Sequence, residues 1–392
     1  MYSSTDCNFC NTQICTKTSF KGAKSMKKWS LFTLLLTVLV LVLAACSDSS
    51  DDDSSTDTND QSTQGDSGTT ETETNPSGKL IIYTGRDEGM VEEIIAKFNE
   101  KYPDITVEFM TMGAQQILER ARGEKANPQG DFWWGGTQSA MMVAADEDLL
   151  LPWTPSFESA IDPLHRDAQN RWVGEMLLPE VIMINSDMIS KEEGPQDWDD
   201  LLDPKWKDKI LIRGVLASGT MRTIYSSMIY RQGADTPEKG YEWLAKLDAN
   251  TKEYTQDPNA LYLKLTRQEG SVSLWNLQDI LLKKYTTDYP FDYIYPASGA
   301  PILVDAVGIV NNAKNEENAK LFMEFLFDKE VMTDLSHNYY QIPTRTDIDL
   351  AAMPEWYTEL DFKTFDIDWV TMAEKEAEWM EYWDTNVKGK GE

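Results

Sequence analysis

The chain has 392 residues, with 66 acidic and 36 basic side chains and a formal net charge of -30. This length is enough for two domains that each bury a sizeable apolar core. The acidic balance excludes a general nucleic-acid or anionic-lipid surface, because phosphate contacts require clusters of Lys and Arg. We therefore expect no nucleic-acid partner.

An apolar run near the N-terminus ends at a cysteine. Two lysines precede the run at residues 31–43, and residues 43–46 read Leu-Ala-Ala-Cys. A basic start, an apolar middle and small residues before the cleavage point are typical of a secretory signal. A membrane span would need about 20 apolar residues. We predict a signal peptide at residues 26–45 and interpret residues 1–25 as an over-extended start.

The junction at Cys46 also resembles the lipobox of exported lipoproteins. This resemblance implies that Cys46 carries a lipid and anchors the chain to the membrane. No cysteine follows it, so the exported part is built without disulfides. Residues 46–78 are rich in Ser, Thr, Asp and Gly, with almost nothing apolar, and predict a flexible acidic tether.

Strands and helices alternate from residue 79 onward. Apolar or alternating runs at residues 79–83, 105–109 and 131–134 predict strands. Between them, apolar residues spaced for one face of a helix predict helices around residues 90–98 and 114–124. The alternation is typical of an α/β fold with a parallel sheet and helices on its faces.

The loop after the first predicted strand holds the first candidate site. In such sheets, ligands bind where the carboxyl ends of the strands meet the loops. Thr84, Gly85 and Arg86 follow the strand directly, and a guanidinium is suited to clamp a carboxylate or phosphate. A surface ion pair of Arg86 with Asp87 or Glu88 is the alternative.

The third predicted strand ends in two adjacent tryptophans. Neighbouring side chains on a strand point to opposite faces, so we expect only one of Trp133 and Trp134 to line a cleft while the other enters the core. We favour Trp134 as the cleft residue. Gly136 and Thr137, in the loop that follows, are further candidates for ligand contact.

Two extended segments predict crossings between two lobes. Residues 175–185 form a long extended run, and residues 295–301 precede a segment that would return to the first lobe. Hinges of this kind need only a few residues at element ends. The predicted division is a first lobe at 79–180, a second lobe at 181–298, a return to the first lobe at 299–348 and a C-terminal helical segment at 349–392.

The segment 216–223, Leu-Ala-Ser-Gly-Thr-Met-Arg-Thr, follows a predicted strand at 209–212. Apolar spacing after it predicts a helix that ends near Gly233, with Ser218 or Thr220 as the N-cap. A helix N-terminus presents free N–H donors and a partial positive charge. An ordinary capped helix has the same pattern. The predicted anion site consists of Ser218, Gly219, Thr220 and Arg222.

A final candidate loop lies at residues 273–279. Trp275 offers a stacking face, and Asn276 and Gln278 offer neutral hydrogen bonds. These side chains suit a polar organic solute.

Five short motifs follow one another along the chain: Leu-Ile-Ile-Tyr-Thr at 80–84, Asn-Pro-Gln-Gly-Asp at 127–131, Ala-Ser-Gly-Thr at 217–220, Gly-Ala-Pro at 299–301 and Ile-Pro-Thr-Arg at 342–345. In this order they resemble the solute-binding proteins of ABC importers, in the cluster of ferric, thiamine, phosphonate and sugar-phosphate binders. The resemblance implies a two-lobed α/β periplasmic-binding-protein fold of type II, a ligand in the cleft, and an ABC permease and ATPase as partners. It implies no enzymatic activity and no cofactor, and we expect a monomer.

The ligand implied by this reasoning is a small anionic or polyhydroxylated solute, such as a phosphonate or a sugar phosphate. A ferric-ion binder is the first alternative. The paired tyrosines of the ferric branch are absent near residue 275 and the two histidines are isolated, yet carboxylates such as Glu175 and Asp305 leave iron open. A secreted surface hydrolase using Ser218 is the second alternative, although no Gly-x-Ser-x-Gly elbow surrounds it.

Overall fold

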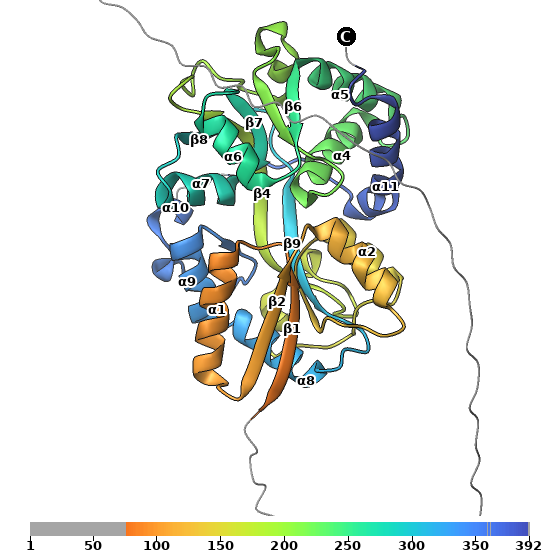
Figure 1. Cartoon of the computed structure of the whole chain (residues 1–392), viewed down its shortest axis with the longest axis vertical. Coiled ribbons are helices and arrows are strands. Elements are labelled where there is room, and N and C mark those ends of the chain that lie inside the picture. Colours follow the sequence, from red (N-terminus) through yellow and green to blue (C-terminus); the bar gives the residue numbers. More distant parts are fainter. Residues whose placement is uncertain (1–75, 359, 361, 391–392) are drawn as a thin grey trace, which may run out of the picture. The chain divides into compact units, whose positions relative to one another are not determined.

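The computed structural model describes residues 76–358, 360 and 362–390 (Figure 1). The predicted over-extended start, the signal peptide, Cys46 and nearly all of the predicted tether lie outside the described residues. Within the described part, no helix is both long enough and apolar enough to cross a membrane.

Three strand–helix units open the described chain, as the sequence predicts. Strand β1 pairs in parallel with both β2 and β3, so the first sheet is parallel on this side. Helix α1 begins where the Asp87 carboxylate accepts hydrogen bonds from the first-turn amides of Gly89 and Met90. The units are β1 (Gly78–Thr84), α1 (Glu88–Lys101), β2 (Ile105–Thr111), α2 (Ala114–Glu124), β3 (Phe132–Thr137) and α3 (Gln138–Asp146).

One long strand, β4 (Val173–Asn185), belongs to both lobes. Its first half pairs antiparallel with β9 (Ile302–Ile309) and with β10 (Ile342–Pro343). Its second half pairs antiparallel with β7 (Val272–Asn276) and β8 (Phe291–Ile294). The extended run predicted at residues 175–185 is therefore the strand along which the chain passes from one lobe to the other.

The second lobe repeats the strand–helix pattern. Strand β5 pairs in parallel with β6 and β7. Ser218 caps α4 by accepting a hydrogen bond from Met221 N–H at 3.3 Å, which settles the choice between Ser218 and Thr220 as the N-cap. The elements are β5 (Ile210–Arg213), α4 (Gly219–Gly233), α5 (Glu238–Asn250), β6 (Thr251–Thr255), α6 (Pro258–Thr266) and α7 (Leu277–Thr286).

Strand β9 brings the chain back to the first lobe. It pairs antiparallel with β3 and completes the strand order β2-β1-β3-β9-β4-β7-β5-β6. After it come α8 (Glu316–Leu326), α9 (Lys329–Tyr339) and the short α10 (Glu355–Thr358). Short 3-10 helices lie at Glu158–Ala160, Pro163–His165, Trp198–Leu202, Pro204–Trp206 and Leu350–Ala352.

The last helix, α11 (Trp369–Asn386), packs into the core of the second lobe. It buries Met372, Trp379, Met380 and Trp383 against the strands and helices of that lobe. Burying side chains of this size contributes about 1.5–3 kcal/mol each. The same helix also contacts α3 of the first lobe. The first lobe has its own core, built from β1, β3, β9, α1, α8 and α9.

Candidate functional site

A cavity of about 140 Å³ lies between the two lobes and adjoins a larger one of about 610 Å³. The two cavities share Arg86, Arg213 and Asp279 among their lining residues. Alternate side chains of β4 and β9 form one wall of the smaller cavity, which we call the floor; it consists of Met176, Leu178, Leu303 and Asp305.

Five helices of the two lobes begin at the smaller cavity. After β1, β2, β3, β5 and β7, the chain turns into a helix whose N-cap residue lines this space. Each N-terminus carries unsatisfied N–H groups and a partial positive charge of roughly half a unit. Together they make the cavity attractive to an anion. The N-caps are Asp87 of α1, Gly113 of α2, Thr137 of α3, Ser218 of α4 and Asn276 of α7.

The start of α4 fits closely against the first lobe. A Cβ atom added to Gly219 would lie 2.5 Å from Thr137 Cγ2, and one added to Gly113 would lie 2.3 Å from the Ala217 carbonyl oxygen. Only glycine therefore allows these helix ends to approach so closely. Within the described residues, the N–H groups of Gly219 and Thr220 make no hydrogen bond to protein, so they are free to meet a ligand.

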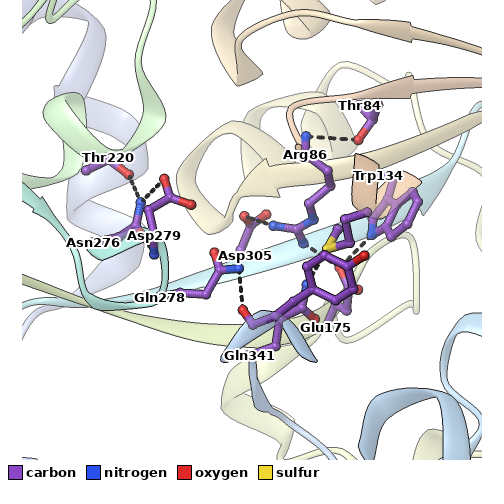
Figure 2. Close-up of polar contacts among 12 residues, drawn as sticks. Thr84, Arg86, Trp134, Glu175, Thr220, Asn276, Gln278, Asp279, Asp305 and Gln341 are labelled. Atoms are coloured by element: carbon purple, nitrogen blue, oxygen red, sulfur yellow. Dashed lines mark hydrogen bonds and ion pairs between the residues drawn. The ribbon is translucent and has the colours of Figure 1, made fainter. Parts of the chain in front are cut away.

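Arg86 lies at one end of the cavity, between two carboxylates (Figure 2). Its Nη1 is 2.6 Å from Asp305 Oδ2, and its Nη2 pairs with Glu175 Oε2, which also accepts a hydrogen bond from Trp134 Nε1 at 2.8 Å. The arginine is only 8% exposed. The sequence alternative, a surface pair with Asp87 or Glu88, is wrong, because Arg86 points inward to β4 and β9.

Arg86, Glu175 and Asp305 together contain one basic and two acidic side chains. Burial raises the pKa of Asp305 to about 6; Arg86 opposes this rise and Glu175 adds to it. Burial lowers the pKa of Arg86, but the two carboxylates outweigh it and the net change is upward. One guanidinium thus serves two carboxylates, which leaves the group of Arg86, Glu175 and Asp305 with an excess of negative charge.

The second-lobe end of the cavity is built around Asp279 on α7. Its Oδ2 accepts hydrogen bonds from Tyr262 Oη at 3.1 Å, Trp275 Nε1 at 2.9 Å and Asn276 Nδ2 at 3.1 Å. Figure 2 shows Thr220 beside Asn276 and Asp279, in a group separate from the one around Arg86. These bonds hold the carboxylate in one orientation at the cavity wall.

Arg213, the last residue of β5, is the basic side chain that remains available. It lines both cavities, and its Nε is buried with no hydrogen-bond partner among the described residues. Burial lowers its pKa, against the effect of Tyr262, Asp257 and Asp279. Arg213 forms no ion pair with a described residue, so its guanidinium can bind an anionic group of a ligand.

Most of the predicted site residues come together here. Those that line the smaller cavity are Gly85, Arg86, Thr137, Ser218, Gly219, Thr220, Trp275, Asn276 and Gln278. Thr84 is buried behind them, where its Oγ1 accepts a hydrogen bond from Arg86 N–H at 3.1 Å. Gly136 is also buried, against Trp133 and Met141.

The expectation that one of the adjacent tryptophans lines the cleft is wrong. Trp133 is 1% exposed and packs in a core with α2 and α3, while Trp134 is fully buried in the core on the other face of the sheet. Helices cover both faces of this sheet, so each tryptophan enters a core. Trp134 reaches the site only indirectly, by orienting Glu175.

Arg222 does not complete the anion site. Its Nε is 2.5 Å from Glu376 Oε1 of α11, and both residues are buried. The side chain lines a different cavity, whose walls come from α2, α3 and α11. Sequence reasoning missed Arg213 and the apolar floor residues Met176, Leu178 and Leu303, and it named Asp305 only as a possible iron ligand.

Both lobes touch each other at the rim of the cavity. Lys283 Nζ of α7 lies 3.3 Å from Asp87 Oδ2, and Gln278 Nε2 donates to the Tyr339 carbonyl oxygen at 2.7 Å. The described residues contain no group of three or more His, Cys, Asp or Glu side chains arranged to hold a metal ion.

A polar cavity between two α/β lobes that share crossover strands is typical of the class of two-lobed solute-binding proteins. Residues 136–367 match the family described as bacterial extracellular solute-binding protein, and the chain belongs to this family. This confirms the resemblance stated from the sequence and the type II two-lobed fold.

Three similar proteins illustrate the range of the family. The structure of the periplasmic binding protein AfuA from Actinobacillus pleuropneumoniae, with exogenous fructose-6-phosphate bound, is 25% identical, has a TM-score of 0.71, and the match covers 80% of this chain and 99% of that one. A putative 2-aminoethylphosphonate-binding periplasmic protein of Salmonella typhimurium is 27% identical over 63% of this chain and 72% of that protein. Iron uptake protein A1 of Synechocystis is 23% identical over 74% of this chain and 82% of that protein.

Proposed function

We propose that this protein is the solute-binding component of an ABC importer, and that it captures a small anionic or polyhydroxylated solute between its lobes. The convergence of five helix N-termini on one cavity carries this proposal. A phosphonate or a sugar phosphate is the class of solute that such a site fits best, because its oxygens accept hydrogen bonds from several N–H groups at once.

Three predicted residues and Arg213 would contact the solute directly. The free N–H groups of Gly219 and Thr220, the Thr220 hydroxyl and Arg213 bind the anionic group, and Trp275 packs against the body of the solute. Arg86 has less capacity for the solute than the sequence indicates, because both of its Nη atoms already pair with carboxylates.

Delivery requires a membrane and partners. In this proposal the signal peptide at 26–45 directs export, lipidated Cys46 holds the protein at the outer face of the cell membrane, and residues 46–78 give the body reach. The protein acts as a monomer, with one lobe from residues 79–180 and 299–348 and the other from residues 181–298, whose core also includes α11 of the C-terminal segment 349–392. The loaded form docks on a permease that an ATPase drives.

The names of the relatives support the two solute classes. The Salmonella protein is named for an aminophosphonate, and the Actinobacillus structure contains a sugar phosphate. The Synechocystis relative is named for iron uptake, which keeps ferric ion as the second candidate. The carboxylates of Glu175 and Asp305 favour it, although Arg86 occupies the position between them that a cation would take.

A hydrolase is the weakest of the three. The Ser218 hydroxyl caps α4 rather than facing a base, and no histidine occurs among the described residues that line the cavity.

Thermal melting with separate solutes tests the proposal. We expect fructose 6-phosphate or a small phosphonate to raise the melting temperature without turnover, since a ligand at 100 times its Kd stabilises the folded state by about 2.7 kcal/mol. Thr220→Val should weaken that solute about tenfold, because it removes one hydrogen bond to a charged group. A shift with ferric ion alone would favour the iron alternative, and conversion of a substrate would favour the hydrolase.

Thr223→Val is the matched control. Thr223 lies one turn further along α4, is 1% exposed and does not line the cavity. The same change of hydroxyl to methyl should therefore leave affinity unchanged there. Equal weakening by both substitutions would contradict the assigned site.

A further inference from the structure

A buried carboxyl group lies beneath the second-lobe end of the smaller cavity. Glu180 on β4 is 0% exposed, and neither of its oxygens has a hydrogen-bond partner at normal distance and angle among the described residues. Its partner in the sheet is Asn276 of β7. Side chains directly opposite each other in an antiparallel pair lie on one face of the sheet, with their Cβ atoms about 5 Å apart. Because Asn276 caps α7 and lines the cavity, Glu180 lies directly behind the start of that helix.

Thr220 lies between this carboxyl group and the cavity. Its Oγ1 is 3.5 Å from Asn276 Nδ2, a contact drawn in Figure 2. The Thr220 hydroxyl is also close enough to Glu180 for hydrogen bonding to act on the pKa of the carboxyl, which it lowers. Thr220 itself lines the cavity at the start of α4. One hydroxyl therefore adjoins the buried acid on one side and the proposed anion site on the other.

The charges around Glu180 favour its neutral form. Burial, Asp279 of α7 and Asp305 of β9 hold its pKa well above the usual range, against the effect of Thr220. No basic side chain among the described residues opposes this rise, and Arg86 pairs instead with Asp305 and with Glu175 on the same strand as Glu180. A bound anion would raise the pKa further, because a nearby like charge disfavours the ionised form.

The protonation state of Glu180 decides which way the Thr220 hydroxyl points. A hydroxyl has one hydrogen to donate and two lone pairs that accept. Neutral Glu180 can donate its own proton to Thr220 Oγ1, and Asn276 Nδ2 occupies the other lone pair, so the hydroxyl hydrogen is left to point into the cavity. Ionised Glu180 accepts that hydrogen instead, and the hydroxyl then offers a solute oxygen only a lone pair, which repels it.

We propose that Glu180 is a positioning residue for the anionic group of the solute: with its proton it holds the Thr220 hydroxyl as a donor to the solute, and without its proton it withdraws that donor. The inference rests on the proposed function and adds that the anion binds together with a proton on Glu180. Solute affinity therefore falls as the pH rises and Glu180 ionises.

Calorimetric titration of the full chain and of Glu180→Gln between pH 6 and pH 9 tests this role. The probes are fructose 6-phosphate and propylphosphonate. A glutamine amide still donates to Thr220 but does not ionise. Titration of the probe itself affects both proteins alike, so the ratio of the two affinities isolates Glu180. We expect the variant to bind within about twofold of wild type at pH 6 and at least about tenfold more tightly at pH 9, where wild type has lost a hydrogen bond to a charged group.

Each other outcome has a distinct meaning. An affinity ratio that does not vary with pH would overturn the inference while the proposed function stands. If that constant ratio is a loss in the variant, Glu180 has a merely structural role; if it is a gain, Glu180 is ionised throughout. If wild type binds neither probe at any pH, the proposed function and the inference are both wrong.

Two further measurements complete the test. Glu376→Gln is the control, because Glu376 is also buried with one unpartnered oxygen but lies outside this cavity, and it should keep the pH profile of wild type. Should Glu180→Gln fail to fold, calorimetry of wild type at pH 8.5 in two buffers of different ionisation enthalpy counts the protons taken up. Fructose 6-phosphate is dianionic there, since its second pKa is about 6. We expect proton uptake on binding, and its absence would overturn the inference.

Discussion

Arg86 and Arg222 occupy two similar settings with different consequences. Both are 8% exposed, and both form ion pairs with residues far away in the sequence. Arg86 joins the end of β1 to β4 and β9 and lies at the solute cavity. Arg222 joins α4 to α11 and lies at a separate cavity. The residue type and its burial are shared, so the elements around each arginine decide its role.

The largest expected difference lies in stability. Arg86→Met leaves Glu175 and Asp305 together and unpaired, and removing one partner of a buried pair costs about 3–5 kcal/mol. Arg222→Met leaves one buried carboxylate, Glu376, and should cost less. Urea unfolding of the two variants measures both free energies.

A second substitution sharpens this comparison. Adding Glu376→Leu to Arg222→Met should restore most of the stability, because apolar replacement of a buried ion pair is often neutral. Solute affinity should stay at the wild-type value in that double variant. Equal stability losses for Arg86→Met and Arg222→Met, or a loss of affinity in the double variant, would show that the two regions do not differ as described.

The two sides of α4 give a prediction of intermediate size. Gly219→Ala places a methyl group against Thr137 Cγ2 and should keep the lobes slightly apart. Overpacking of this kind costs about 1–3 kcal/mol, so we expect roughly tenfold weaker solute binding. Thr137→Ser removes the opposing methyl and should restore affinity in the double variant. Calorimetric titration of the wild type, of Gly219→Ala and of the double variant measures these affinities. If the double variant binds the solute as weakly as Gly219→Ala does, the contact with Thr137 is not the cause of the loss.

The smallest effect depends on pH and belongs to the Arg86 region. The pKa of Asp305 rises from 3.8 to about 6 on folding, so its contribution favours the folded state below pH 3.8 and is lost as the pH rises through about 6. The Asp305→Asn variant has no carboxyl group to ionise at this position, so it does not lose this stability as the pH rises. Arg86 still pairs with Glu175 in the variant. The melting temperature of the variant relative to wild type should therefore be a few degrees higher at pH 7.5 than at pH 5. A difference that does not vary with pH would contradict this assignment.

Local structure could be predicted from the sequence because its signals are local. The apolar spacing and the Ser218 cap place α4 correctly, and the alternating runs place β1 to β3. The partner of Arg222, in contrast, is 154 residues away, and nothing near Arg222 indicates that α11 covers that side of the helix. The prediction that Trp134 lines the cleft was wrong for a similar reason. The alternation of side chains along a strand does not show whether helices cover both faces of the sheet.

One sequence signal would have found more of the site. Glu175, Glu180 and Asp305 interrupt the otherwise apolar strands β4 and β9. Burying a charged side chain in a strand is costly unless a partner or a ligand compensates it, so such residues mark a site. Sequence reasoning named Glu175 and Asp305 only as possible iron ligands. Their pairing with Arg86 could not be predicted, because Arg86 lies far away in the sequence, in the loop after β1.

The position of α11 has a consequence for how this family member is made. Trp379 and Trp383, with Met372, Met380 and Val387, belong to the second-lobe core, whose other buried residues lie between Val181 and Ile294. That core stays open until the chain has been synthesised beyond residue 383, so the nascent polypeptide has little chance to become compact early. If the chain is exported unfolded, as the proposed signal peptide implies, this order is an advantage, because the second lobe closes only after residue 383 has passed the membrane.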